Sequence, residues 1–101
     1  MIVVRDNPEA GRYEGWVDGA LAGFAEYRVV GGRIIFTHTE VDEAFEGQGI
    51  GSALAGGALD DVRERVQLPV VPRCPFIRGW IERHPTYADL VDGGTPAAGG
   101  E

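Results

Sequence analysis

Hydrophobic and polar positions alternate in four short runs over residues 1–41. The runs are "MIVVRD", "GRYEGWV", "ALAGFAEYRVV" and "RIIFTHTEV". The dipeptides Asp18-Gly19 and Gly31-Gly32, which separate the last three runs, are typical of two-residue hairpin turns. Because no apolar periodicity of helical length occurs in this part of the chain, we predict an antiparallel β-meander.

The last of these runs, residues 33–41, begins with apolar residues on both faces of the predicted strand. Strict alternation divides it into two sets, one on each face. The first set is Ile34, Phe36, His38 and Glu40, and the second is Ile35, Thr37, Thr39 and Val41. The segment alone does not decide which set faces the core.

The hydrophobic period changes after Asp42, where apolar residues begin to recur every four positions. They are Ile50, Leu54, Ala58, Val62 and Val66. This spacing predicts a helix with one apolar stripe, ending before Pro69. Gly56 and Gly57 lie within it, although each glycine costs a helix about 1 kcal/mol relative to alanine. We therefore expect this part of the helix to pack closely on the sheet.

The remainder predicts a short strand in "QLPVVPRC" and a second helix in "PFIRGWIERH", since proline is favoured at the first helical position. We expect the buried face of this helix to consist of Phe76, Ile77, Trp80 and Ile81. We also expect His84 to bind free carbonyl groups at its end. The order of elements indicates a single α/β (α+β) domain over residues 1–92. Residues 93–101, rich in glycine and proline, are expected to form a disordered tail.

The acidic composition disfavours some classes of partner. The chain has 101 residues with sixteen acidic side chains, nine arginines and no lysine, giving a net charge of −7. Diffuse electrostatic attraction to nucleic acid or to an anionic membrane is therefore not expected. The single cysteine, Cys74, leaves no intrachain disulfide and too few thiols for a zinc ribbon, and we assign no metal site. No secretory or membrane-spanning pattern opens the sequence, so we expect a cytoplasmic protein.

A glycine-rich segment, "FEGQGIGSAL" at residues 45–54, lies where the last strand of the meander meets the first helix. Its glycines are Gly47, Gly49 and Gly51. A strand that leads into a helix through glycines presents several backbone N–H groups and the positive helix end to one point. The missing side chains allow a pyrophosphate to approach the backbone. The segment therefore predicts a phosphate-binding loop, with a tight turn that binds no ligand as the alternative.

Two common phosphate-binding motifs do not fit this segment. A P-loop requires a lysine after its glycines, and the chain has none. A dinucleotide-binding fingerprint requires G-x-G-x-x-G in a βαβ unit of a parallel sheet. Here the glycines follow an antiparallel meander and have a different spacing.

The segment resembles the pyrophosphate loop of the GNAT superfamily of acyl-CoA-dependent N-acetyltransferases, which has the pattern Gln/Arg-x-x-Gly-x-Gly/Ala. The corresponding residues here are Glu46-Gly47-Gln48-Gly49-Ile50-Gly51. The flanking sequences "HTEVDEAFEGQGIGSAL" and "LPVVPRCPFIRGWIERHPTYADLV" are similar to the small, single-domain branch often called minimal acetyltransferases. The resemblance extends from about Ile34 to Val91. It implies a truncated GNAT-type fold that lacks two helices of the larger members, and hence a shallow, open acceptor groove.

The resemblance implies acetyl-CoA as cosubstrate and an amine as acceptor. The residues that it assigns to the pyrophosphate are Gly47, Gln48, Gly49, Gly51 and Ser52, and Val41 is the expected backbone partner of the pantetheine arm. Glu46 stands where the superfamily has glutamine or arginine, so we expect the backbone of the loop to bind the phosphates.

Acetyl transfer requires an amine to lose a proton while it attacks a thioester carbonyl. His38 and Glu40, two residues apart on the last strand of the meander, are candidate bases, directly or through a water. Cys74 precedes a helix N-terminus, where the pKa of a thiol is lowered, so it is a candidate acyl acceptor in a ping-pong scheme. The structural alternatives are a half-exposed histidine without chemistry and a cysteine that packs as a small hydrophobic residue.

We therefore expect an acetyl-CoA-dependent N-acetyltransferase that acts on an amine of a small molecule or a protein. One alternative is a CoA-sensing or interaction module that binds the cosubstrate with little turnover. Another is an acyl-thioester carrier or hydrolase that acts through Cys74.

Overall fold

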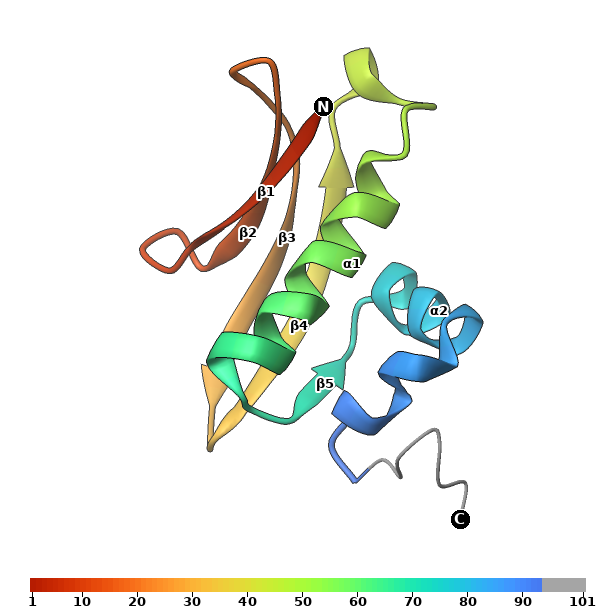
Figure 1. Ribbon diagram of the computed structural model, residues 1–101. Coiled ribbons are helices and arrows are strands. Elements are labelled where there is room, and N and C mark those ends of the chain that lie inside the picture. Colours follow the sequence, from red (N-terminus) through yellow and green to blue (C-terminus); the bar gives the residue numbers. More distant parts are fainter. Residues whose placement is uncertain (94–101) are drawn as a thin grey trace.

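The meander is formed by β1 (Ile2–Asn7), β2 (Arg12–Val17), β3 (Ala20–Val30) and β4 (Arg33–Val41). The computed structural model describes residues 1–93 (Figure 1). All neighbouring pairs among these four strands are antiparallel, and β5 (Val70–Pro72) completes the five-stranded sheet by pairing in parallel with β4. The predicted α/β fold is confirmed. The expected disordered tail, apart from Gly93, lies outside the described residues.

Two α-helices follow the meander, as the sequence predicts. They are α1 (Ile50–Asp61) and α2 (Pro75–Arg83). A π-helical turn, η2 (Val62–Val66), extends α1, and Gln67 ends it before Pro69 with a positive φ of 57°. Short 3₁₀ segments, η1 (Glu43–Phe45) and η3 (Pro85–Leu90), precede α1 and follow α2.

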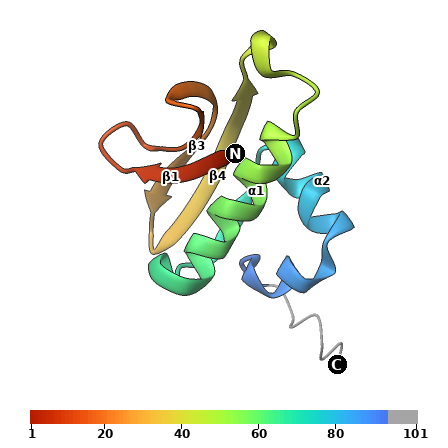
Figure 2. The same ribbon diagram turned by 45° about the horizontal axis from the view of Figure 1, so that its top comes forward.

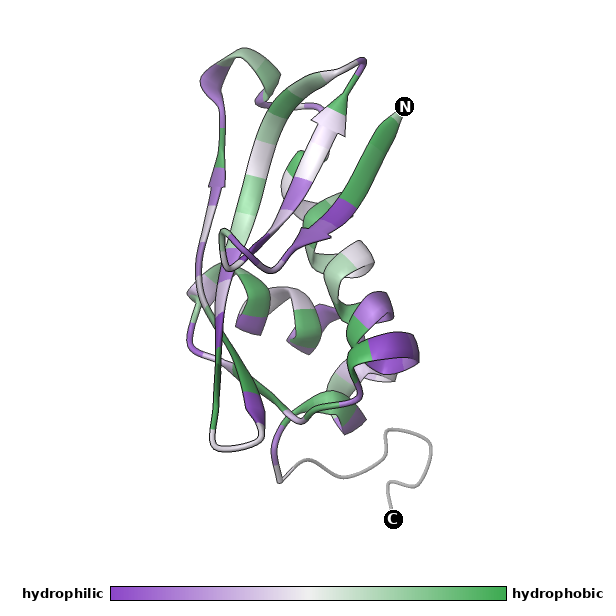
Figure 3. Cartoon of the chain, turned by 90° about the vertical axis from the view of Figure 1, so that its left-hand side faces the viewer, coloured by the Kyte–Doolittle hydropathy of each residue, from purple (hydrophilic) through white to green (hydrophobic). Residues whose placement is uncertain are grey.

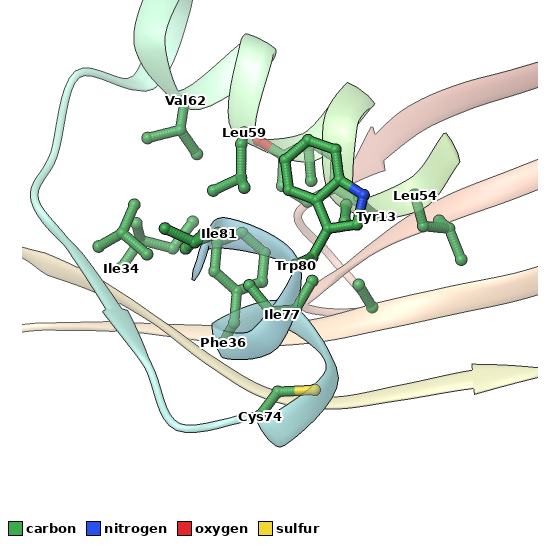
Figure 4. Packing of buried hydrophobic residues seen from close by; sticks show 14 of the residues in the cluster. Tyr13, Ile34, Phe36, Leu54, Leu59, Val62, Cys74, Ile77, Trp80 and Ile81 are labelled. Atoms are coloured by element: carbon green, nitrogen blue, oxygen red, sulfur yellow. The ribbon is translucent and has the colours of Figure 1, made fainter. Parts of the chain in front are cut away.

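Both α-helices lie on one side of the sheet (Figures 1 and 2). Short hydrophobic and hydrophilic stretches alternate along the strands (Figure 3), as expected for a sheet with one buried face. Figure 4 shows α2 contributing Ile77, Trp80 and Ile81 to the same core as Phe36 of β4 and Leu59 of α1. The opposite face of the sheet has no covering helix among the described residues.

Gly56 and Gly57, in the middle of α1, allow close packing on two different neighbours. A Cβ atom added to Gly57 would lie 2.9 Å from Cβ of Val4 on β1, so this glycine does pack on the sheet as expected. Gly56 instead faces Trp80 of α2, with 3.4 Å between an added Cβ and the indole ring. The predicted sheet contact is therefore right for Gly57 and wrong for Gly56.

A bulge in β4 reverses the predicted faces of its second half. Tyr27 pairs with Phe36 but the preceding Glu26 pairs with His38, so Thr37 is an extra residue in β4. Such an insertion shifts every later side chain to the other face. Phe36 is buried, whereas His38 is exposed. The prediction that His38 and Glu40 share a face with Ile34 and Phe36 is therefore wrong.

Candidate active site

The glycine loop joins η1 to α1 and is shaped by two left-handed residues. Asp42 caps η1, where its Oδ1 accepts a hydrogen bond from Ala44 N–H at 2.8 Å. Gly47 has a φ of 84° and Gly49 a φ of 78°. Glycine adopts such positive φ angles readily, whereas they cost other residues conformational free energy. The chain can therefore turn sharply from the end of β4 into the first turn of α1.

The first turn of α1 presents free backbone donors. Gly49 is the N-cap residue and supplies no side chain to cap the helix. The first backbone hydrogen bond of the helix runs from Ala53 N–H to Gly49 O at 3.0 Å. Within residues 1–93, the N–H groups of Ile50, Gly51 and Ser52 have no hydrogen-bond partner. These donors and the positive end of the helix dipole form a site suited to an anion.

These donors open into a groove of about 330 Å³. The residues that line it are Val41, Phe45, Glu46, Gly47, Gly49, Ile50, Gly51, Ser52 and Phe76. The loop and the start of α1 contribute backbone donors, and β4, η1 and α2 contribute apolar side chains. The groove therefore combines backbone donors for phosphate with an apolar wall.

The backbone of Val41 points toward the open edge of β4. The N–H group of Asp42 points toward β3 and donates a hydrogen bond to Ala22 O of that strand at 2.8 Å. In an antiparallel pair, successive residues point alternately toward the partner strand and away from it. The N–H and C=O groups of Val41 are therefore directed away from β3, as required of a residue that binds an extended ligand through its backbone.

β4 and β5 separate halfway along β4. Their pairing ends at Phe36 and Pro72, after which Cys74 N–H donates to Phe36 O at 2.9 Å. Beyond this point β4 continues to Val41 while the other chain segment turns into α2. Within the part of the chain that the structure describes, the second half of β4 therefore has no paired strand on this side.

Cys74 lies where the two segments separate, as the N-cap residue of α2 (Figure 4). It is only 3% exposed, and its Sγ lies 3.3 Å from Oγ1 of Thr39. The thiol is thus placed beside the separated strands but is covered in this structure. Its position is compatible both with an acyl acceptor and with a small core residue.

His38 and Glu40 contact each other on the uncovered face of the sheet. Their Nε2 and Oε1 atoms are 3.0 Å apart, and both side chains are more than half exposed. The ring of Phe24, the cross-strand partner of Glu40, lies 6.3 Å from the imidazole of His38 between centroids. The structure therefore brings these two candidate bases together and places them on the face opposite the helices.

The cosubstrate residues expected from the sequence occupy one region, with one exception. The residues that line the groove are Val41, Gly47, Gly49, Gly51 and Ser52. The sixth expected residue, Gln48, does not line it.

Phe76 also belongs to this region, which the sequence did not indicate. We expected its side chain to be buried with Ile77, but it is 40% exposed and lines the groove. Phe76 is the second residue of α2 and lies beyond the end of the core. Helical spacing alone does not reveal where along the helix the core ends. His84, by contrast, contacts the carbonyl oxygen of Trp80 at 2.7 Å, as predicted.

The chain matches a known protein family over most of its length. Residues 12–90 match the sequence profile described as GCN5-related N-acetyl-transferase. The chain belongs to this family. The family is one of acyltransferases, in accord with the resemblance found in the glycine loop and its flanks.

Solved structures show the same fold. A GCN5-like protein from Staphylococcus aureus, determined by NMR, has 22% sequence identity and a TM-score of 0.66, with 98% of this chain and 95% of that chain covered. A ribosomal-protein-alanine N-acetyltransferase from Brucella melitensis has 24% identity and a TM-score of 0.57. That similarity covers 71% of this chain and 57% of the Brucella chain, so this chain spans little more than half of the larger enzyme. Comparison with curated protein sequences gives no match.

Two further observations apply to residues 1–93. None of their helices is long and apolar enough to cross a membrane. They contain no group of three or more His, Cys, Asp or Glu side chains arranged to hold a metal ion.

One carboxylate on the uncovered face is buried. Glu14 is 7% exposed and accepts hydrogen bonds from Asn7 Nδ2 at 3.0 Å, Arg12 Nε at 2.8 Å and Trp16 Nε1 at 3.2 Å. Burial by itself raises the pKa of this carboxyl, but the three hydrogen bonds and the charge of Arg12 outweigh burial and lower the pKa below its ordinary value of 4.5.

We expect Glu14→Gln to reduce the free energy of unfolding at pH 7 by about 1–2 kcal/mol, because hydrogen bonds to a charged group are lost. Since the pKa of Glu14 is lower in the folded than in the unfolded chain, the native protein should lose this contribution as the pH falls below 4.5. Urea unfolding between pH 3 and 7 should therefore show a smaller difference between the two proteins at low pH. Glu64→Gln, at an exposed position of η2, should leave stability at pH 7 unchanged. A difference for Glu14→Gln that does not vary with pH would contradict this assignment.

Proposed function

We propose that the protein transfers an acetyl group from acetyl-CoA to an amine. The observation that carries the proposal is the row of free N–H groups at Ile50, Gly51 and Ser52, which opens into a groove ending at the unpaired edge of β4. A pyrophosphate fits the donors, and an extended pantetheine arm fits the groove toward Val41. The residues present therefore fit coenzyme A without any lysine or arginine in the groove lining.

In this proposal the backbone of Gly47, Gln48, Gly49, Gly51 and Ser52 binds the pyrophosphate, and the backbone of Val41 orients the pantetheine arm. Glu46 also lines the groove, so one carboxylate lies near the phosphates and the backbone donors must offset its repulsion. Binding by uncharged amides is compatible with the net charge of −7.

The acetyl group can pass to the amine by either of two routes. In direct transfer, the amine nitrogen attacks the thioester carbonyl, its proton passes to Glu40 or His38 directly or through a water, and the CoA thiolate leaves. In the covalent route, the Cys74 thiolate displaces CoA and forms an acetyl-thioester, which the amine then attacks to regenerate the thiol. The covalent route requires the buried thiol of Cys74 to become accessible.

The positions of the candidate catalytic groups favour one alternative function. Cys74 is buried, and His38 and Glu40 are exposed on the face of the sheet opposite the helices. A protein with this arrangement can bind acetyl-CoA with little turnover and act as a CoA sensor or interaction module. The two functions make different predictions for thiol release in the presence of amines.

Intact-protein mass spectrometry after mixing with acetyl-CoA, combined with calorimetry, tests the proposal. We expect the native protein and Cys74→Ser both to bind CoA. An acetyl adduct present in the native protein and absent in Cys74→Ser would assign the covalent route, and amine-dependent thiol release without an adduct would assign direct transfer. Because the chain has no lysine, a stable adduct can lie only at Met1, at Cys74 or at a hydroxyl group.

Two outcomes would count against the enzyme. Binding without thiol release across a broad panel of amines would support the sensor. If the folded protein does not bind CoA at all, the proposed role of the glycine loop is wrong.

A further inference from the structure

The third glycine of the loop differs from the other two. Gly47 and Gly49 have positive φ angles, and a Cβ atom at either would meet nothing within 4 Å. Gly51 lies in the first turn of α1 without a positive φ, but an added Cβ would be 2.8 Å from Cζ of Phe76 and 3.3 Å from Cε2. Gly51 therefore packs closely against an aromatic ring that a side chain at this position would displace, whereas the first two glycines are favoured by backbone conformation.

The ring of Phe76 is held in this place although it is not fully buried. Its edge rests on Gly51, and 40% of the residue remains exposed at the groove. Exposing so large an apolar side chain costs free energy that burial by a ligand would recover. The ring is therefore placed to contact whatever occupies the groove.

The lining of the groove has two chemically different parts. The free N–H groups at the start of α1 suit a diphosphate. Val41, Phe45 and Phe76 give the rest of the lining an apolar character. The diphosphate of a nucleotide would contact only the donors, whereas a ligand with a long, mainly uncharged arm on its diphosphate would also contact the apolar side chains.

We propose that Phe76 determines specificity for the pantetheine arm, so that the protein selects coenzyme A over the nucleotide portion of the same molecule. In this arrangement the ring of Phe76 packs along the arm opposite the backbone of Val41, and Gly51 is kept small so that the ring can lie against α1. The inference rests on the proposed function and adds a side chain that selects the ligand.

The test compares two ligands by calorimetry: CoA and adenosine 3′-phosphate 5′-diphosphate, which is CoA without the pantetheine arm. We expect Phe76→Ala to weaken CoA binding about tenfold, because the ring's apolar contact with the arm is lost. Binding of the nucleotide should change by less than about twofold. Phe76→Leu should lose less CoA affinity than Phe76→Ala. Gly51→Ala, which displaces the ring, should likewise weaken the binding of CoA more than the binding of the nucleotide.

Phe24→Ala is the matched control, since it removes a phenylalanine ring on the other face of the sheet and should leave CoA binding unchanged. Thermal unfolding of each variant confirms that it is folded. Equal loss of affinity for both ligands in Phe76→Ala and Phe76→Leu would overturn the inference, because the ring would then only shape the phosphate loop. Unchanged CoA binding would also overturn it while leaving the proposed function intact. Failure of the native protein to bind either ligand would instead refute the proposed function.

Discussion

Alanine at position 49 is expected to weaken CoA binding about 10- to 100-fold, the loss that follows when one charge-assisted hydrogen bond is removed. Gly49 holds a φ of 78° as the N-cap of α1, and no neighbouring atom lies within 4 Å of a Cβ at this position. The substitution therefore acts through the backbone alone. Alanine destabilises the left-handed conformation by about 1 kcal/mol, and relaxation of the loop turns the N–H groups at the start of α1 away from a common point.

Gly19→Ala provides a matched control for the strain itself. Gly19 has a φ of 83° in the β2–β3 turn, and it too has open space around the position of a Cβ. Both variants should lose about the same free energy of unfolding in urea titrations, on the order of 1 kcal/mol. Only Gly49→Ala should lose CoA affinity in calorimetry. Similar CoA binding by the two variants would show that the loop does not hold the phosphates.

The hairpins and the glycine loop were predictable because their signals are local. Asp18-Gly19 and Gly31-Gly32 adopt positive φ values at all four positions, which is the conformation that such dipeptides favour. The start of α1 follows from the change of hydrophobic period after the loop. In each case the residues that carry the signal also adopt the conformation.

The bulge in β4 could not be predicted from the strand in which it occurs. Thr37 becomes an extra residue because of how β4 aligns with β3, and both faces of β4 begin with an apolar side chain. The apolar pattern is therefore compatible with either face of β4 being buried. The consequence for the site is large, because the bulge turns Thr39 toward Cys74 and moves His38 and Glu40 to the uncovered face.

The role of Gly51 was hidden for a related reason. The sequence places three glycines at alternate positions, which suggested one shared purpose for them. The third packs against Phe76, 25 residues further along the chain, and Phe76 itself has the spacing of a core residue. Packing between segments distant in the sequence determines both the contact of Gly51 and the position of Phe76. A local sequence pattern carries no information on such packing.

Gly23→Ala is expected to be the most destabilising of these substitutions, with a loss of about 3 kcal/mol in the free energy of unfolding. Gly23 lies in β3 opposite Val41. An added Cβ would lie 2.6 Å from the carbonyl oxygen of Glu40, 3.2 Å from Cα of Val41 and 3.3 Å from Cγ2 of Ile50. The first two contacts are with backbone, so no change of rotamer relieves them. A domain of this size has a total stability of about 5–15 kcal/mol, so the loss should be plain in a urea unfolding curve.

Gly15→Ala tests whether the effect comes from this close approach or from any methyl group added beneath α1. Gly15 is the cross-strand partner of Gly23 in β2, and its added Cβ would meet Leu54 at an ordinary 3.4 Å. We expect Gly15→Ala to be neutral or slightly stabilising, by less than about 1 kcal/mol, since alanine restricts the unfolded chain. Comparable losses for the two variants would contradict the proposed cause. Because the methyl group at position 23 pushes against both Val41 and Ile50, folded Gly23→Ala should also bind CoA more weakly than folded Gly15→Ala. That result would link Gly23 to the groove. Glycine at this position lets Ile50, the first residue of α1, and Val41, at the open edge of β4, come close enough to hold one ligand.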